Sequence, residues 1–302
     1  MSIKIHRKIN SEKVFHRFAF VALLVLAVIC IMPILLIVIA SFTDEHTLLA
    51  EGYRFFPAQL STMAYEYLWK QSSMMIRAYG VSILVTVLGT VLSIMLSTLF
   101  AYPLSRKDFK YRNFFSFFIF FTMLFSGGIV PSYMMWSRFF HMKDTIWALV
   151  IPTYLMSAFN VLLIRNFYSN NVPDALVEAA RIDGASEFHI FGRVMLPLSV
   201  PVIATVGLFT GLSYWNDWIN GLYYINDPGL YSIQNLLIRL MNNIQYLNSG
   251  AAAGALSGGA TALPSASVRM AIAVVGVIPV VLAYPFLQKY LIRGTVIGAV
   301  KG

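Results

Sequence analysis

Six long apolar runs divide this chain, and each is about the length that crosses a lipid bilayer as a helix. They cover approximately residues 18–40, 78–104, 114–136, 145–164, 198–215 and 268–287. The first run is too long for the apolar core of a signal peptide, and no small-residue cleavage site follows it. The sequence therefore predicts an all-α, polytopic membrane protein with six transmembrane helices.

The composition excludes several other classes of protein. Of the 302 residues, 58% are hydrophobic and only 12% are charged, which is more apolar than a soluble domain of this size requires. The net charge is +9, but the basic residues are scattered among the apolar runs and form no continuous stripe, so nucleic acid is not an expected partner. The single cysteine, Cys30, lies inside the first run and supports neither an intrachain disulfide nor a metal cluster.

The distribution of Lys and Arg predicts the orientation of the chain. Six spans place both termini on one side, and fifteen of the 22 Lys and Arg residues fall in segments on that side. The positive-inside rule then makes residues 1–17 a cytoplasmic N-terminal segment, 293–302 a cytoplasmic tail and 223–267 an extracytoplasmic loop. Within that loop, residues 230–240 show helical periodicity suited to the membrane surface, and 250–267 is a flexible Ala/Gly/Ser-rich stretch.

One long polar segment between apolar runs, residues 173–197, has the pattern of two short helices joined by a sharp turn. Pro173 and Asp174 supply a helix start, and Gly184 ends that helix because glycine accepts the left-handed conformation. Ser186 then caps a second short helix. On composition alone this segment is equally well an ordinary amphipathic loop, but two helices at a sharp turn also make a knob that suits docking into a groove of another protein.

The spacing within this knob carries a resemblance to a known family. Glu178-Ala179-Ala180, then Gly184, then Val194-x-Leu196-Pro197 resembles the EAA loop of binding-protein-dependent ABC importer permeases, with Val194 where the family more often has Ile. The resemblance extends from Ala78 to the C terminus and implies a type I permease core over residues 78–292. It also implies that the knob is a coupling helix docked in a cleft of a cytoplasmic ATPase. The residues implied to dock are Glu178, Ala179, Ala180, Arg181, Asp183, Gly184, Phe188, Arg193, Leu196 and Pro197.

Shorter motifs narrow the resemblance to the second permease subunit of carbohydrate importers of the maltose and multiple-sugar type, and within it to permeases for complex oligosaccharides. These motifs are residues 215–218 (Trp-Asn-Asp-Trp), 298–302, 127–131 and 230–234. The implied partners are a homologous sister permease, two ABC ATPase subunits, an extracellular solute-binding protein and a sugar or oligosaccharide, in a bacterial cell membrane. The chain contains no phosphate-binding loop, so we expect no cofactor here, no catalytic residue and no metal, with ATP and Mg²⁺ held by the partner ATPase.

Asn160, Trp215 and Asn216 are candidates for the substrate path, because aromatic faces and neutral polar groups suit a sugar. Helix packing or anchoring at the membrane interface is the alternative role for each of them. The middles of the spans hold almost no ionisable residues, which disfavours a proton-coupled carrier.

Other functions stay open at this point. A permease for peptides or phosphonates would share the EAA loop, and an ATP-independent channel or membrane scaffold would not need it. A membrane enzyme is disfavoured, because the five histidines are too scattered to pair with a nucleophile or a metal.

Overall fold

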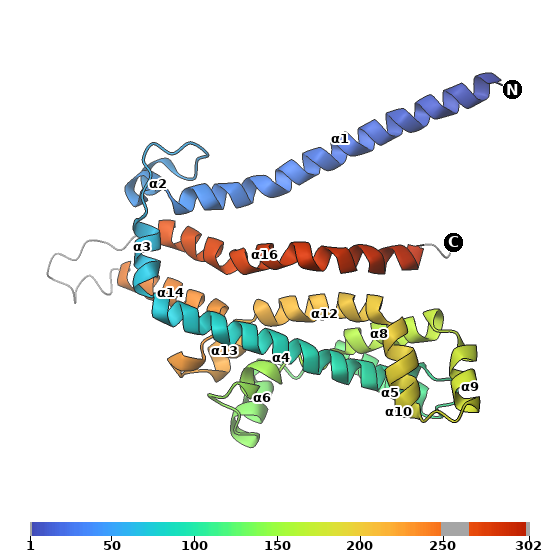
Figure 1. Cartoon of the computed structure of the whole chain (residues 1–302). Helices are drawn as coiled ribbons and strands as arrows, with labels where there is room; N and C mark the ends of the chain where they lie inside the picture. The colour runs from blue at the N-terminus through green and yellow to red at the C-terminus, as the bar shows by residue number, and fades with distance from the viewer. Residues whose placement is uncertain (1, 249–265, 300–302) are drawn as a thin grey trace. The chain divides into compact units, whose positions relative to one another are not determined.

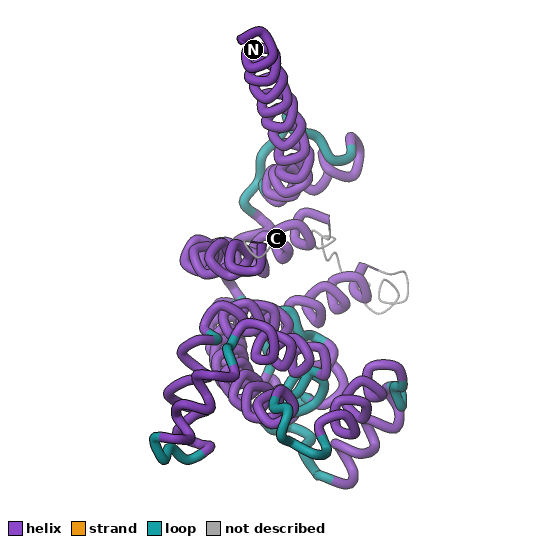
Figure 2. Tube along the Cα trace, turned by 90° about the vertical axis from the view of Figure 1, so that its right-hand side faces the viewer, coloured by secondary structure: helices purple, strands orange, loops and turns teal. Residues whose placement is uncertain are grey.

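The computed structural model describes residues 2–248 and 266–299, and these are almost entirely helical. Figure 2 shows no strand among the described residues, whose one β-type contact is an isolated bridge between Thr43 and Leu60. Backbone contacts divide the chain into two compact units. The first comprises residues 1–71 and 241–278, and the second comprises 72–240 and 279–302.

Two helices in the described part are each long and apolar enough to cross a membrane, α1 (Ser2–Ser41) and α4 (Ser72–Ser105). Two further apolar assemblies are bent at a short break, by 112° and 79°. The first joins α5 (Arg112–Leu124) to α6 (Ile129–Met134) and the π-helix η1 (Met135–Phe139); the second joins α10 (Glu187–Ile190), the π-helix η2 (Phe191–Met195) and α11 (Leu196–Leu198) to α12 (Val200–Trp215). The predicted all-α membrane architecture is confirmed, although length and composition identify two to four spans here against the six expected.

The fourth apolar run, 145–164, is not the continuous helix that its composition predicts. It forms α7 (Trp147–Val150), a non-helical stretch, and then α8 (Ala158–Asn171). Side chains from other segments donate hydrogen bonds to three carbonyls that no helical N–H pairs. Tyr214 donates to the Val150 carbonyl, Asn220 to that of Pro152 and Ser93 to that of Tyr154. Irregular backbone is tolerated at membrane depth only when its polar groups are satisfied within the protein, and these three bonds satisfy three of its carbonyls.

The third run, 114–136, is interrupted at a pair of glycines. Helix α5 ends at Leu124, and Gly128 has a φ of +83°, a conformation that favours glycine, immediately before α6 begins. The hydroxyl of Ser132 then donates to the Gly128 carbonyl. The glycine pair at 127–128 therefore lets the chain fold back.

Helix α4 is the centre of the second unit, and α8 and α12 pack along it. Figure 1 shows α12 running beside α4. A Cβ atom at Gly207 would lie 3.0 Å from Ile94, and one at Gly211 would lie 3.4 Å from the Thr90 hydroxyl. On α4 itself, a Cβ at Gly89 would lie 2.5 Å from the Tyr214 ring. The small residues of α4 and α12 are thus packing faces, where each helix closely approaches the other.

After α12, the second unit continues through three further helical elements up to Leu240. They are α13 (Ile219–Tyr224), the 3-10 helix η3 (Pro228–Leu230) and the first half of α14 (Ile233–Asn248). The apolar side chains of α14, including Ile233 and Leu236, are buried in the protein, so its helical periodicity is confirmed but its apolar face does not face a membrane surface. Buried Asp217 caps α13 by accepting from two backbone N–H groups, and buried Asn235 accepts from Arg239.

The first unit contains α1, α2 (Glu45–Glu51), α3 (Met63–Lys70) and the start of α16 (Ala266–Ala299). The Glu45 carboxylate accepts from the backbone N–H groups of Ala266 and Ser267 at 2.9 Å and from the Ser267 hydroxyl at 2.8 Å. This carboxylate satisfies donors that α16 cannot pair within itself. The predicted sixth span, 268–287, lies within α16, whereas nearly all of the predicted loop 250–267 and the last three residues of the 298–302 motif lie outside the described residues.

Replacing Gly89 with Ala tests the packing of α4. We expect the variant to lose about 1–3 kcal/mol of stability, because the new methyl group overlaps the Tyr214 ring, which is buried and fixed by its hydrogen bond to Val150. Thermal unfolding of the purified chain in detergent measures the effect. Gly80→Ala on the same helix is the matched control, since nothing lies within 4 Å of its new Cβ. Equal unfolding temperatures for the two variants would contradict the packing described here.

Candidate functional site: a helical knob beside the end of α4

The knob begins with α9 (Asp174–Ile182), which ends in a tight left-handed turn. Gly184 has a φ of +80°, and its N–H donates to the Arg181 carbonyl at 3.0 Å. The N–H of Ala185 donates to the Ala180 carbonyl, also at 3.0 Å. This pair of bonds is the Schellman arrangement, which requires a left-handed residue at the position that Gly184 occupies. The predicted helix stop at Gly184 is confirmed.

The second helix of the knob, α10, begins where the sequence predicts. Ser186 is its N-cap, and the Ser186 hydroxyl accepts from the His189 N–H at 3.4 Å. The π-helix η2 and α11 follow without a break and carry the chain into α12. Asp174 is the first residue of α9, after Pro173 at the N-cap, and its carboxylate accepts from Lys107.

The knob packs against the longer helices of the second unit, to which it belongs. Val177 of α9, Ile190 of α10 and Met195 of η2 are at most 2% exposed and share one apolar cluster with residues of α4, α8 and α12. Helix α8 in turn holds the end of α4, because Arg165 donates to the Leu104 carbonyl at 3.3 Å. A basic side chain at a helix C terminus also matches the negative end of the helix dipole. The knob is therefore held on the helices beneath it by a shared apolar core.

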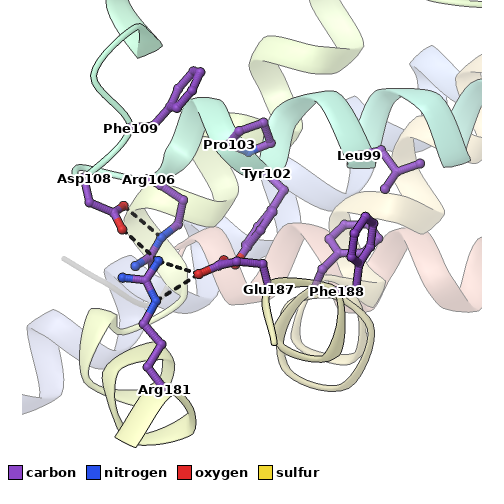
Figure 3. Close-up of a pocket in the computed structure, with 10 residues that line it drawn as sticks. Leu99, Tyr102, Pro103, Arg106, Asp108, Phe109, Arg181, Glu187 and Phe188 are labelled. Atoms are coloured by element: carbon purple, nitrogen blue, oxygen red, sulfur yellow. Dashed lines mark hydrogen bonds and ion pairs between the residues drawn. The ribbon is translucent and has the colours of Figure 1, made fainter. Parts of the chain in front are cut away.

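A cavity of about 390 Å³ lies between the knob and the end of α4, and Figure 3 shows its charged side chains. Arg181 of α9 occupies the centre of the network. Its Nη2 lies 2.7 Å from Asp108 Oδ2 and 2.6 Å from Glu187 Oε1. The hydroxyl of Tyr102 on α4 donates to the other oxygen of Glu187, and Arg106 Nε lies 3.4 Å from Asp108 Oδ1. One connected network thus joins α4, the turn after it, α9 and α10.

A second ion pair lies at the opposite end of α9. Lys107 Nζ is 2.8 Å from Asp174 Oδ2. Lys107 and Asp108 are neighbours in the α4–α5 turn, residues 106–111, so this one turn contacts α9 at both of its ends. Surface ion pairs of this kind contribute about 1 kcal/mol or less to stability, so their main effect is on position.

The two carboxylates of the turn contacts stay ionised at neutral pH. The hydrogen bond from Arg181 lowers the pKa of Asp108, and the hydrogen bond from Lys107 lowers the pKa of Asp174. A carboxyl group whose pKa is lowered on folding contributes stability above its unfolded pKa and loses that contribution as the pH falls through the folded value. Both contacts are therefore insensitive to pH across the neutral range and weaken only in acid.

Two large apolar side chains project from the knob into the surroundings. Ile182 is 87% exposed and Phe188 is 82% exposed. Glu178 and Arg193 are exposed as well, and within the described part of the chain neither makes an ion pair. The outer surface of the knob therefore combines two exposed apolar side chains with two charges that form no ion pair among the described residues.

The structure places the predicted docking residues in three settings. Most are exposed on the knob, Ala180 and Leu196 are partly buried, and Arg181 is occupied by the network. The predicted docking residues do not include Ile182, although its position directly before the Asp-Gly turn is a signal for exposure. They also do not include Lys107, Asp108 or Glu187. Glu187 lies six residues after Arg181, but the other two are about 70 residues away, and no local pattern reveals that contact.

The three predicted path residues lie apart from the knob. Asn160 is buried, and its amide donates to the Thr210 hydroxyl at 3.1 Å, which is a helix-to-helix contact between α8 and α12. Trp215 is 8% exposed and its ring stacks on Tyr79 at 6.3 Å. Among the described residues its indole N–H has no acceptor. Asn216 is exposed and donates to the Leu212 carbonyl.

The described residues thus form an apolar helical assembly that carries an exposed knob of two short helices. Residues 89–297 match the family model described as "Binding-protein-dependent transport system inner membrane component", and the chain belongs to this family. It is therefore a multi-pass membrane protein and a permease of an ABC importer. The predicted family is confirmed.

Individual proteins are similar to this chain over nearly its whole length. The chain is 37% identical over 293 residues to the "Polygalacturonan/rhamnogalacturonan transport system permease protein YtcP" of Bacillus subtilis, covering 96% of this chain and 99% of that one. It is 36% identical over 276 residues to "Protein LplC" of the same species, covering 91% and 90%. A solved structure, "a bacterial ABC transporter involved in the import of the acidic polysaccharide alginate", matches with a TM-score of 0.74 at 29% identity, over 93% of this chain and 97% of that chain.

Replacing Gly184 with Val tests the turn of the knob. We expect transport to fall at least tenfold while the protein still inserts and accumulates, because the left-handed conformation costs an L-residue about 1–2 kcal/mol and the turn shifts. Uptake by cells that express the whole importer gives the measurement, with the membrane level checked by immunoblot. Gly192→Val is the matched control, because its Cβ also meets open space but its φ is not left-handed. Normal uptake in the Gly184 variant would refute this role for the turn.

Proposed function

We propose that this chain is the sugar-translocating permease subunit of an ATP-driven importer and that its knob docks into a cleft of a separate ATPase. The observation that carries the docking proposal is that Ile182 and Phe188 are each more than four-fifths exposed, whereas Val177, Ile190 and Met195 of the same knob are buried. Burying a large apolar side chain at an interface contributes about 1.5–3 kcal/mol, and the rigid Schellman turn presents this pair without a further ordering cost.

The other parts of the assembly follow from the same proposal. We expect a homologous sister permease, two ATPase subunits that hold ATP and Mg²⁺, and an extracellular binding protein that delivers the substrate. The excess of Lys and Arg in segments on the side of the knob supports a cytoplasmic location for the knob and both termini. ATP hydrolysis takes place on the partner subunits, and this chain converts their closure into movement of its helices.

An acidic oligosaccharide is the substrate class that we propose. The names of two similar proteins support it, since polygalacturonan is a polymer of a uronic acid and alginate is named as an acidic polysaccharide. In this chain Arg77 is exposed near the start of α4 and forms no ion pair within the described residues, so a cation is free to meet a sugar carboxylate. Relatives named for arabinooligosaccharides and for melibiose, raffinose and stachyose make a neutral oligosaccharide the alternative.

We propose that Trp215 and Asn216 border the substrate path and that Asn160 positions the helices around it. The exposed amide of Asn216 is a neutral polar group suited to sugar hydroxyls, and Trp215 precedes it with a largely buried ring. The Asn160 amide is already used by Thr210, which favours a packing role for that residue.

Changing both Ile182 and Phe188 to Ser tests the docking surface. We expect recovery of the ATPase with the tagged chain in mild detergent to fall at least tenfold. Both apolar side chains that the ATPase would bury are lost, while the buried core of the knob is unchanged. Phe56→Ser is the control, since Phe56 is 92% exposed but lies in a segment predicted on the other side of the membrane. Undiminished recovery of the ATPase by the double variant would rule out docking through this surface.

The substrate class is tested with the binding protein and the reconstituted importer. We expect trigalacturonate to bind the binding protein at least tenfold more tightly than maltotriose, and to be the sugar taken up, because a desolvated carboxylate paired with a cation discriminates strongly against a neutral analogue. Calorimetry and uptake into vesicles give the two measurements. Preference for maltotriose would replace the acidic class with a neutral one and leave the importer proposal standing.

A further inference from the structure

We propose that the α4–α5 turn clamps α9 at both ends and thereby carries the movement of the knob into α4 and α5. This inference rests on the proposed function, because it concerns where the force from the ATPase goes. The chain already joins α9 to α8 on one side and, through α10 and η2, to α12 on the other. Helices α4 and α5 have no such direct covalent link to the knob, so they follow its movement only through non-covalent contacts, which are the shared apolar cluster and the contacts of the turn.

The charges on α9 match the turn in position and in sign. Asp174 and Arg181 are seven residues apart, which is about two helical turns, so both lie on one face of α9. Lys107 and Asp108, adjacent in the turn, present the opposite charge to each of them, with contacts of 2.8 and 2.7 Å. Exchanging the two partners would bring like charges together at both ends. The arrangement therefore fixes the orientation of α9 relative to the turn.

The C-terminal contact is continuous with α4 itself. Arg181 also binds Glu187 of α10, and Glu187 accepts the hydroxyl hydrogen bond of Tyr102 on α4. Figure 3 shows this chain of contacts running from α9 to α4 beside the turn. Movement of α9 is thus passed to α4 both through the turn and through Tyr102, with no flexible segment between them.

The exposure of the Lys107–Asp174 ion pair indicates that it orients α9 and adds little to the stability of the fold. The Lys107 and Asp174 side chains are 78% and 54% exposed, and water screens the attraction between such groups. Removing this pair therefore leaves folding almost unchanged, whereas the apolar core beneath Val177 and Ile190 keeps the knob attached. What the pair supplies is a fixed angle, and that angle is what transmits movement.

The test follows the separation of α5 and α12 in the complete importer with its ATPase. Spin labels are placed at Phe120→Cys on α5 and Phe209→Cys on α12, both exposed positions, after the native Cys30 is replaced by Ser. Pulsed electron resonance gives the distance between them without nucleotide and with ATP and vanadate. This readout needs no substrate, so it does not depend on which sugar the importer carries.

We expect Lys107→Asp or Asp174→Lys alone to reduce the nucleotide-driven change in this distance at least twofold. The exchange variant that carries both changes restores the opposite charges, and we expect it to recover most of the change. Lys110→Asp is the matched control in the same turn, because Lys110 forms no ion pair within the described residues and its reversal leaves the change intact. Thermal unfolding of every variant stays within the spread of the unchanged chain.

Three outcomes decide the proposal. An undiminished distance change in both single variants would overturn it, as would impairment that the exchange variant fails to repair. A complete importer in which α5 does not move against α12 on addition of nucleotide would also overturn it. Failure of the unchanged chain to recruit any ATPase is a separate result, and it would overturn the proposed function on which the clamp depends.

Discussion

The close approach of α4 and α12 is the constraint on which the second unit depends. Gly89 leaves room for the Tyr214 ring, and that ring's hydroxyl reaches the Val150 carbonyl in the non-helical stretch after α7. One side chain thus fixes the spacing of two helices and satisfies a backbone group that no helix pairs. Membrane proteins pair such backbone groups within the protein, because an unpaired backbone group in hydrocarbon costs several kcal/mol.

The knob combines two kinds of interaction with different tasks. Burial of Val177, Ile190 and Met195 holds it on the helices below, and the Schellman turn at Gly184 fixes its shape. Ion pairs from the α4–α5 turn, by contrast, add little stability and set its angle. The proposed coupling role needs both, because a knob that is attached but free to pivot would not pass the movement of an ATPase on to the helices. The outer residues Ile182 and Phe188 are left unpaired by this design and are available to a partner.

Local sequence patterns predicted a substantial part of this structure. The Gly184 stop and the Ser186 cap were both readable, because each depends on the conformational or hydrogen-bonding preference of one residue. The fourth run was predicted wrongly as one helix. Its apolar composition fits a helix, and the side chains that stabilise its irregular backbone come from segments remote in the sequence.

The sequence by itself determined the membrane class, the family and the position of the knob, because hydrophobic run length, charge asymmetry and the spacing from Glu178 to Pro197 are all written along the chain. Only the tertiary structure decided that Arg181 binds Asp108, that Lys107 binds Asp174, and that the Asn160 amide is occupied by Thr210. Pairings between residues 50 to 75 positions apart depend on how helices pack, and packing is set by the whole set of side chains at once rather than by any local pattern.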